Sequence, residues 1–317
     1  MIGAGPWGGT LTRTFERIPG VDLRWICDLD DHRRAAAQAV HPRASVTAYV
    51  DEVLADPDVV AVVVAVDAPQ HHAVGVRVLG ANRHALVEKP LALSVSDATA
   101  LCDAANAKAR LLTVGHLLLH HPAVQRTKQL MEAGVLGAPL YFEATRTVTG
   151  TSRRGGSAWW TLAPHDISLA LHLFEGPPIT VSAVGSRDTT SDHDIATFGT
   201  LHFAGGRLAH IHAARLAPAR ERRFSVVGSD RALSFDELAS SPILRFSRPA
   251  VIEPGVSVDQ IRFDASDPLF AQCLHFTTCA ARGDTTGGNA AHALAVVRVL
   301  EAGARSMATG GAPVEVR

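Results

Sequence analysis

Short apolar runs alternate with helix-like segments through the first part of the chain. The apolar runs are residues 21–27, 59–66, 85–87 and 111–114, and helical patterns between them include 30–40 and 71–82. Strands that alternate with helices are typical of a parallel sheet. Residues 59–66 contain no polar side chain, which predicts a strand buried on both faces. Ser94, with Asp97 three residues later, predicts the start of a further helix that ends near Lys108.

The pattern changes after His116. Apolar runs at 140–148, 179–184, 195–203, 207–216 and 223–227 are separated mainly by turn residues. The two runs that flank residues 204–206 predict a β-hairpin. From Pro122 onward only a few segments have a helical pattern: 122–133, 164–174, 268–281 and 290–308. We therefore predict an α/β chain with two domains. Residues 1–117 form a parallel-sheet domain, and residues 118–317 form an α+β domain with a large, mostly antiparallel sheet.

Composition limits the partners that we expect. A chain of 317 residues exceeds what one core usually organises, and a net charge of -1 gives no attraction to nucleic acid. No apolar run reaches the roughly 20 residues that span a bilayer, and no export signal is recognisable. We expect no membrane association and a cytoplasmic location. The four cysteines lack a C-x-x-C spacing and are expected to be reduced, mostly buried thiols.

A glycine-rich motif stands at the N-terminus. Gly3, Gly5 and Gly8 fit G-x-G-x-x-G, a pattern that allows a tight turn, close approach of the backbone to a pyrophosphate, and close helix packing. Asp28 follows at the end of the next strand, where a carboxylate can bind the adenosine ribose. We predict a Rossmann dinucleotide-binding domain over residues 1–117. Its expected cofactor-binding residues here are Gly3, Gly5, Pro6, Trp7, Gly8 and Asp28.

The residues after Asp28 favour NAD over NADP. Asp30 and Asp31 concentrate negative charge where the 2′-phosphate of NADP would lie. Arg33 and Arg34 keep NADP open as an alternative, although a solvated helix face is the more common environment for such residues.

Only Met1 and Ile2 precede Gly3, where this fold has a central strand of about five residues. We therefore expect a truncated first strand, because an empty central position would leave backbone groups of two strands unpaired. A start codon placed too late is our interpretation of the short N-terminus.

Two motifs carry candidate acid–base chemistry. Lys89, in Glu-Lys-Pro, follows a strand at the carboxyl edge of the predicted parallel sheet, where it can bind a substrate hydroxyl and pass its proton. Pro164 begins a helix whose first turn contains His165, a residue that can act as acid or base. The alternatives are an exposed strand-end lysine and a surface histidine. Since no His or Cys set has a recognisable ligand spacing, we expect no metal.

These motifs, in this order, resemble the Gfo/Idh/MocA oxidoreductase family over nearly the whole chain. The residues that carry the resemblance include the glycine motif, Asp28, Ala68-Pro69, Glu88-Lys89-Pro90, Gly115-His116, Arg146 and Pro164-His165-Asp166. The sequence is most similar to the branch that acts on nucleotide-linked N-acetylated sugars or their uronic acids. The resemblance implies an NAD(P)-dependent dehydrogenase or reductase of a CH–OH group in a sugar, cyclitol or nucleotide sugar. It also implies a homodimer or homotetramer joined through the open face of the second sheet.

The resemblance assigns roles to individual residues. Lys89 is implied to be the catalytic lysine, and His165 the second proton-transfer residue. The cofactor is expected to contact Ala68, Pro69, Glu88, Lys89 and Pro90, and the substrate is expected to contact His116, Arg146, Thr161 and Asp166. A surface arginine on a sheet is an equally good interpretation of Arg146.

Two departures from the family pattern leave other functions open. Thr161 stands four residues before His165, where relatives commonly have Asp, so a charged partner of the histidine is lost. Asp67 adds a negative charge at the strand end where many relatives have Thr-Pro. A reductase of an imine or non-sugar ketone, and a cofactor-binding regulator without turnover, are the alternative functions.

Overall fold

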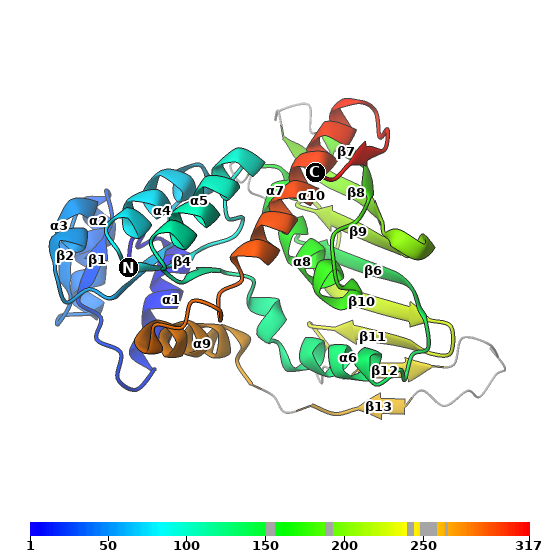
Figure 1. Ribbon diagram of the computed structural model, residues 1–317, viewed down its shortest axis with the longest axis horizontal. Coiled ribbons are helices and arrows are strands. Elements are labelled where there is room, and N and C mark those ends of the chain that lie inside the picture. Colours follow the sequence, from blue (N-terminus) through cyan, green and yellow to red (C-terminus); the bar gives the residue numbers. More distant parts are fainter. Residues whose placement is uncertain (150–155, 188–192, 240–243, 248–258, 264–265) are drawn as a thin grey trace. The chain divides into compact units, whose positions relative to one another are not determined.

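The computed structural model describes residues 1–149, 156–187, 193–239, 244–247, 259–263 and 266–317 (Figure 1). The chain divides into two compact units. Unit 1 comprises Met1–Leu117 and Asp267–Val297, and unit 2 comprises Leu118–Ser266 and Arg298–Arg317. The predicted second domain, 118–317, included residues 267–297, whereas the structure packs this segment within unit 1.

Unit 1 contains a parallel sheet. Its strands are β1 (Trp25–Cys27), β2 (Ser45–Thr47), β3 (Ala61–Val64), β4 (His84–Val87) and β5 (Leu112–Val114). β1 pairs with β2, and β4 lies between β3 and β5. Ile2 joins the two groups, because it forms parallel bridges to both Cys27 and Val64. Met1 and Ile2 thus occupy the central position of the sheet.

Helices cover both faces of this sheet. They are α1 (Pro6–Glu16), α2 (Asp31–Val40), α3 (Val50–Ala55), α4 (His71–Gly80), α5 (Val95–Ala107) and α9 (Pro268–Arg282), with the short helix η1 (Ala68–Gln70) after β3. A second short helix, η2 (Leu117–His120), begins at the last residue of the segment Met1–Leu117 and continues into unit 2. Val62 and Val64 pack in one apolar cluster and Val63 in the other. This alternation explains why the strand has no polar position. The Ser94 side chain accepts a hydrogen bond from Asp97 N–H at 3.1 Å, as its predicted capping role requires.

Unit 2 contains a second sheet. Its strands are β6 (Pro139–Thr147), β7 (Thr180–Arg187), β8 (Asp194–His202), β9 (Leu208–Ala214), β10 (Glu221–Gly228), β11 (Ala232–Asp236), β12 (Leu244–Ser247), β13 (Asp259–Ile261) and β14 (Val314–Glu315). Their order is β13-β12-β11-β10-β6-β9-β8-β7-β14. In the described ranges every pairing is antiparallel except that of β6 with β9. The predicted hairpin is β8 and β9, joined by η3 (Ala204–Gly206), where Gly205 takes a φ of 74°.

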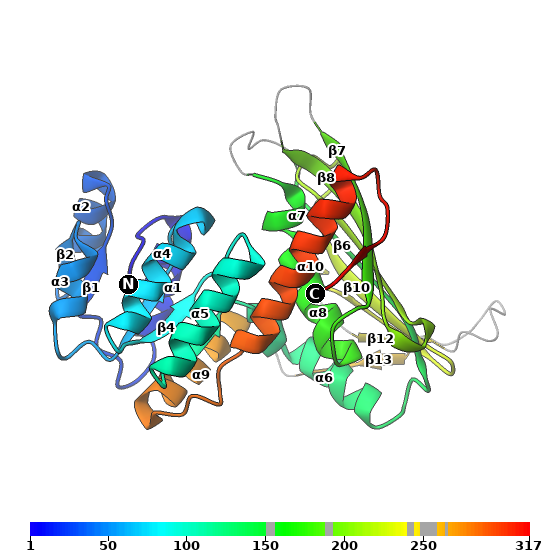
Figure 2. The ribbon, with the colours of Figure 1, turned by 45° about the horizontal axis from the view of Figure 1, so that its top comes forward.

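Helices lie on one face of this sheet, as Figure 2 shows. They are α6 (Pro122–Glu132), α7 (Ala158–Thr161), α8 (Ala163–Phe174) and the second half of α10 (Ala290–Ala308). On β9 the residues Ala209 and Ile211 are buried, whereas Leu208 and His210 are exposed. The alternation indicates one covered and one open face.

Trp159, on α7, is the largest fully buried side chain among the described residues. Its indole N–H donates to Leu300 O at 2.9 Å. An added Cβ would lie 2.6 Å from the ring at Gly199 and 2.4 Å from it at Gly303. Glycine at these two positions therefore makes room for the indole between β8 and α10.

Candidate functional site

The glycine motif forms the turn into α1. Gly3 has a φ of 97°, and an added Cβ there would lie 2.4 Å from Ala65 O. A Cβ on Gly8 would lie 2.0 Å from Gly3 O, so packing within the protein requires both glycines. Gly5 differs, because an added Cβ there would meet only Arg33 Nη1, at 3.8 Å. Gly5 is the N-cap of α1 and makes no side-chain hydrogen bond. The N-terminus of α1, with Pro6 and Trp7 in its first turn, can therefore receive a pyrophosphate at Gly5.

Asp28 follows β1 beside this loop. Its Oδ2 accepts a hydrogen bond from Ala4 N–H at 2.7 Å, and its Oδ1 accepts one from Asp30 N–H at 2.9 Å. Arg33 Nη1 lies 3.7 Å from Oδ2, while Arg34 donates to the Asp28 carbonyl at 2.7 Å. The carboxylate is thus fixed where a ribose is expected, with one guanidinium directly beside it.

Glu88 lies at the carboxyl end of β4 and is 7% exposed. Its Oε2 accepts a hydrogen bond from Lys89 N–H at 3.1 Å, and Trp7 also hydrogen-bonds the carboxylate. Burial raises the pKa of Glu88, while the Trp7 hydrogen bond and the Lys89 charge oppose this shift. Oε1 has no hydrogen-bond partner among the described residues. This oxygen lies against Gly115, where an added Cβ would be 2.6 Å from it.

His71 connects two strand ends at this edge. Its buried ring lies between Pro90 O, at 2.7 Å from Nδ1, and Val66 O, at 3.0 Å from Nε2. Burial lowers the pKa of His71, and the hydrogen bonds to the two carbonyls oppose this shift. Ala68 and Pro69 form η1 immediately before it. No recognisable motif marks His71 in the sequence, and the one local signal is its position close after Ala68-Pro69.

His116 follows β5 at the same edge and is 2% exposed. Its ring packs edge-on against His292 of α10, with 5.6 Å between ring centroids and 84° between ring planes. Burial, and then the charges of His292 and Lys89, hold the pKa of His116 well below its usual value. No motif marks His292 in the sequence, because its place depends on the packing of residues 267–297 within unit 1.

In unit 2, Arg146 and Asp166 form a buried ion pair. Arg146 Nε and Nη2 donate to the two oxygens of Asp166, each at 3.0 Å, and Nη1 lies 3.6 Å from Glu237 Oε2. Burial raises the pKa of Asp166, and the guanidinium opposes this shift. Two of the four residues that we predicted to contact substrate, Arg146 and Asp166, are therefore bound to one another, and their contact with substrate stays a prediction. This geometry gives both residues a structural place between β6 and α8.

Thr161 and His165 lie on either side of the junction between α7 and α8. The Thr161 hydroxyl donates to Ser157 O at 2.8 Å within the turn of α7. His165 is half-buried in the first turn of α8, immediately before Asp166. His165 belongs to unit 2 and Lys89 to unit 1, and the structure describes each within its own unit.

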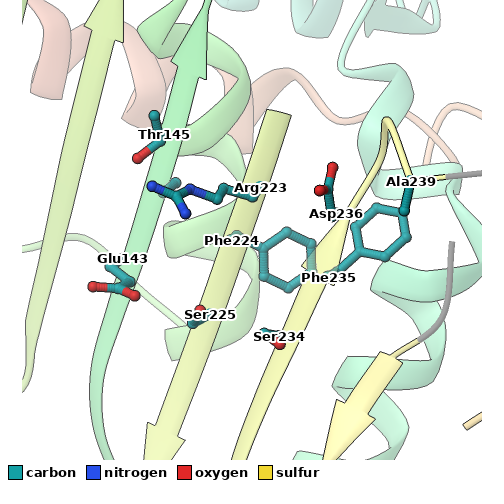
Figure 3. A pocket seen from close by; sticks show the side chains of 10 residues that line it. Glu143, Thr145, Arg223, Phe224, Ser225, Ser234, Phe235, Asp236 and Ala239 are labelled. Carbon is teal, nitrogen blue, oxygen red and sulfur yellow. The ribbon is translucent and has the colours of Figure 1, made fainter. Parts of the chain in front are cut away.

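The open face of the unit 2 sheet carries a separate depression of about 380 Å³ (Figure 3). Its polar lining comes from Glu143, Thr145, Arg223, Ser225, Ser234 and Asp236 on three neighbouring strands. Side chains alternate along a strand, so Glu143 and Thr145 point away from the face that holds Arg146. This depression is therefore not part of the site that contains His165.

No group of three or more His, Cys, Asp or Glu is arranged to hold a metal ion in the part of the chain that the structure describes. No helix there is both long and apolar enough to cross a membrane. The four cysteines all lie in the described ranges, and each is buried and forms no disulfide.

Comparisons with known proteins agree with this architecture. Residues 1–116 match the family model of the oxidoreductase family with an NAD-binding Rossmann fold, and residues 124–234 match the GFO/IDH/MocA C-terminal domain. The chain is 31% identical over 279 residues to UDP-N-acetylglucosamine 3-dehydrogenase of Acidithiobacillus ferrooxidans, which covers 87% of this chain and 86% of the relative. The chain belongs to the Gfo/Idh/MocA family of oxidoreductases.

Solved structures extend the likeness to three dimensions. UDP-N-acetylglucosamine 3-dehydrogenase GnnA from Acidithiobacillus ferrooxidans superposes with a TM-score of 0.85 at 27% identity, over 97% of this chain and 96% of that one. GenD2 from gentamicin A biosynthesis, in complex with NAD, gives 0.83 at 26% identity, over 100% and 95%. The predicted fold class is confirmed, and this chain is an NAD-dependent oxidoreductase.

Proposed function

We propose that this oxidoreductase transfers hydride between NAD and a secondary carbinol carbon of a nucleotide-linked sugar. One observation carries the proposal: a glycine loop open at Gly5 and Lys89 beside the buried Glu88 lie in the same unit, both at the carboxyl side of its parallel sheet. The substrate class comes from the relative at 31% identity, whose name is UDP-N-acetylglucosamine 3-dehydrogenase.

The residues of unit 1 fit NAD. Gly5 and the first turn of α1 would bind the pyrophosphate, and Asp28 would bind the adenosine ribose. Bound NAD supplies the acceptor for the hydride that leaves the substrate carbon. Lys89 takes the hydroxyl proton as that hydride leaves, so the carbinol becomes a ketone, and it returns the proton in the reverse direction. His165 is the second proton-transfer residue, and Glu88, through its bond to Lys89 N–H, fixes the strand end.

Replacing Lys89 tests the mechanism. Lys89→Ala should lower kcat by about 10²- to 10⁴-fold while NADH affinity changes little, because proton transfer is lost and the glycine loop is intact. Lys89→Arg should be nearly as inactive, since a guanidinium stays protonated. His165→Ala should lose less activity. The rates are measured by NADH absorbance with a panel of nucleotide sugars, free sugars, cyclitols and non-sugar ketones. The matched control is Lys108→Ala, which replaces an exposed lysine and should leave the rates unchanged. Full activity of Lys89→Ala would refute the mechanism.

Cofactor choice follows from the surroundings of Asp28. We expect tighter binding of NAD(H) than of NADP(H), because a carboxylate suits a ribose diol and repels a phosphate. Arg33, whose Nη1 lies 3.7 Å from that carboxylate, is the residue that would bind the 2′-phosphate of NADP. Calorimetric titration of both cofactors decides the question. Tighter NADP(H) binding that is lost in Arg33→Ala would show that Arg33 governs the pocket.

We also propose that the cytoplasmic enzyme forms a homodimer or homotetramer through the open face of the unit 2 sheet. Exposed apolar side chains pair across strands there, Tyr141 with Leu208 and Val184 with Phe198. Light scattering measures the assembly. A double change, Leu208→Glu with Phe198→Glu, should yield monomers, and a monomeric unchanged protein would contradict the proposal.

A further inference from the structure

The helix-covered face of the unit 2 sheet opens to solvent at one end of β10 and β11. Phe224 and Phe235 are opposite each other on this face, both are 4% exposed, and their ring centroids lie 5.6 Å apart. The next positions on the same face are Arg222 and Glu237, whose side chains are 31% and 23% exposed. The two phenylalanines therefore close the face, and the charged pair beyond them is accessible.

This pair lies in the same part of unit 2 as His165. Arg222 is in register with Arg146 on the neighbouring strand β6, and such strands are about 5 Å apart. Arg146 in turn binds Asp166, the residue that follows His165 in the first turn of α8. Glu237 is beside Arg222, because its N–H donates to Arg222 O at 2.9 Å. The accessible pair is thus one strand away from the arginine that anchors the turn of His165.

The two arginines differ in the donors that they have left. Arg146 donates through Nε and Nη2 to Asp166, and its Nη1 lies 3.6 Å from Glu237 Oε2. Arg222 donates through Nη1 to Glu237 Oε1 at 2.6 Å, and its Nε and Nη2 make no hydrogen bond with any residue that the structure describes. Arg222 is therefore the arginine of this cluster that can donate to a ligand.

The charges of the cluster compensate one another. It contains two guanidinium groups and two carboxylates, namely those of Arg146, Arg222, Asp166 and Glu237. A cluster without net charge gives little attraction to a phosphate or a carboxylate. A hydroxyl group, in contrast, both accepts and donates, so it suits a guanidinium with unused donors beside a carboxylate with unused lone pairs. The chemistry of the pair favours a polyhydroxylated ring over an anion.

We propose that Arg222 and Glu237 bind two neighbouring hydroxyl groups of the substrate ring and so hold the ring at His165. The inference rests on the proposed function, which supplies a sugar as the substrate. One hydroxyl accepts hydrogen bonds from Nε and Nη2 of Arg222, and the other donates to the Glu237 carboxylate. The ion pair between the two side chains fixes them before the ring binds, which lowers the entropy lost on binding. Both residues bind the ring, and neither transfers a proton.

The first arm of the test measures binding without turnover. Protein saturated with NADH is titrated calorimetrically with UDP-N-acetylglucosamine, because NADH cannot accept a hydride from a carbinol. Arg222→Met and Glu237→Gln should each weaken this binding about 10- to 100-fold, since each removes a charge-assisted hydrogen bond. Arg222→Lys should lie between, because it keeps the charge and loses the forked donor. The affinity for UDP alone should not change, and an equal loss for UDP would show that Arg222 binds phosphate and would overturn the proposal.

The matched control is Arg223→Met. Arg223 is the next residue of β10, points to the open face and pairs with Glu221, so its removal should leave the affinity for UDP-N-acetylglucosamine unchanged. Thermal melting verifies that all variants are folded. Unchanged affinity in Arg222→Met and Glu237→Gln, or an equal loss in Arg223→Met, would overturn the role of the pair.

The second arm measures turnover. Arg222→Met should raise KM by about the same factor and change kcat less than about threefold, because the hydroxyl contacts are made before the chemical step. A loss of kcat with an unchanged KM would contradict a role in ring binding.

Failure of the proposed function gives a different result. If UDP-N-acetylglucosamine does not bind the unchanged protein, the proposed substrate class is wrong, and glucose and myo-inositol replace it as probes of the pair. Failure of all three to bind would overturn the pair as well. Full activity of Lys89→Ala would refute the proposed mechanism, and the titrations with NADH would still decide whether Arg222 and Glu237 bind the ring.

Discussion

Replacing Arg146 by Met removes the guanidinium and leaves the Asp166 carboxylate buried without its bidentate partner. In the unchanged protein Arg146 donates twice to Asp166, each time at 3.0 Å, and both side chains are almost completely buried. The second acidic neighbour, Glu237, keeps a partner after the change, because its Oε1 lies 2.6 Å from Arg222 Nη1. In Arg146→Met, the buried Asp166 carboxylate is therefore the group that loses its partner.

Removing one partner of a buried ion pair costs about 3–5 kcal/mol, because the remaining charge is left without compensation. For a cooperative unit of this size, that corresponds to a fall in melting temperature of about 6–20 °C. Replacing both partners removes both charges. We therefore expect the double variant Arg146→Met with Asp166→Leu to be more stable than either single variant.

Denaturant unfolding of the three variants gives the free energies of unfolding and the coupling between the two positions. Arg222→Met is the matched control. Its side chain is 31% exposed and pairs with the same Glu237, so its removal should cost less than about 1 kcal/mol. Equal losses in Arg146→Met and Arg222→Met, or a double variant that loses the sum of the single losses, would refute the reasoning.

Three further predictions concern packing, thiols and pH. Gly303→Ala should lower the free energy of unfolding by about 1–3 kcal/mol, because the added Cβ would lie 2.4 Å from the Trp159 ring. Gly80→Ala, where nothing lies within 4 Å of the added Cβ, should not lower it, and thermal melting compares the two variants. Burial raises the pKa of Cys273 to about 12, so a thiol reagent at about pH 8 should react only after unfolding. Burial also lowers the pKa of His84 and His116 below the unfolded value of 6.5, so their contribution to stability is complete above that pH and is lost as the pH falls. Melting temperatures should fall from about pH 7 to about pH 5, and a constant value would contradict this.

Local patterns predicted the elements that local physics determines. The apolar run that includes β3, the capping role of Ser94 and the hairpin of β8 and β9 follow from residues close in sequence. The glycine motif likewise fixes a tight turn before α1, because Gly3 and Gly8 have no room for a Cβ.

The same sequence patterns could not predict the tertiary contacts. The apolar face of α9 shows that it is buried, but not on which unit, and residues 267–297 were assigned to the second domain for this reason. The partnership of His116 with His292 depends on that packing. Arg146 and Asp166 are twenty residues apart, on a strand and a helix, so no spacing rule pairs them. The sequence thus names candidate residues, whereas the partners of these residues in the structure depend on the fold.

One edge of the unit 1 sheet concentrates the contacts that the fold makes around Lys89. The carboxyl ends of parallel strands meet at a single edge, so the segments after β3, β4 and β5 become neighbours. His71 ties the first two segments together through Val66 O and Pro90 O, and Glu88 fills the space that Gly115 leaves at the third. These contacts fix the backbone at Lys89, so a bound substrate does not have to order this segment of the chain. The residues that close the sheet are therefore also those that position the backbone of the lysine.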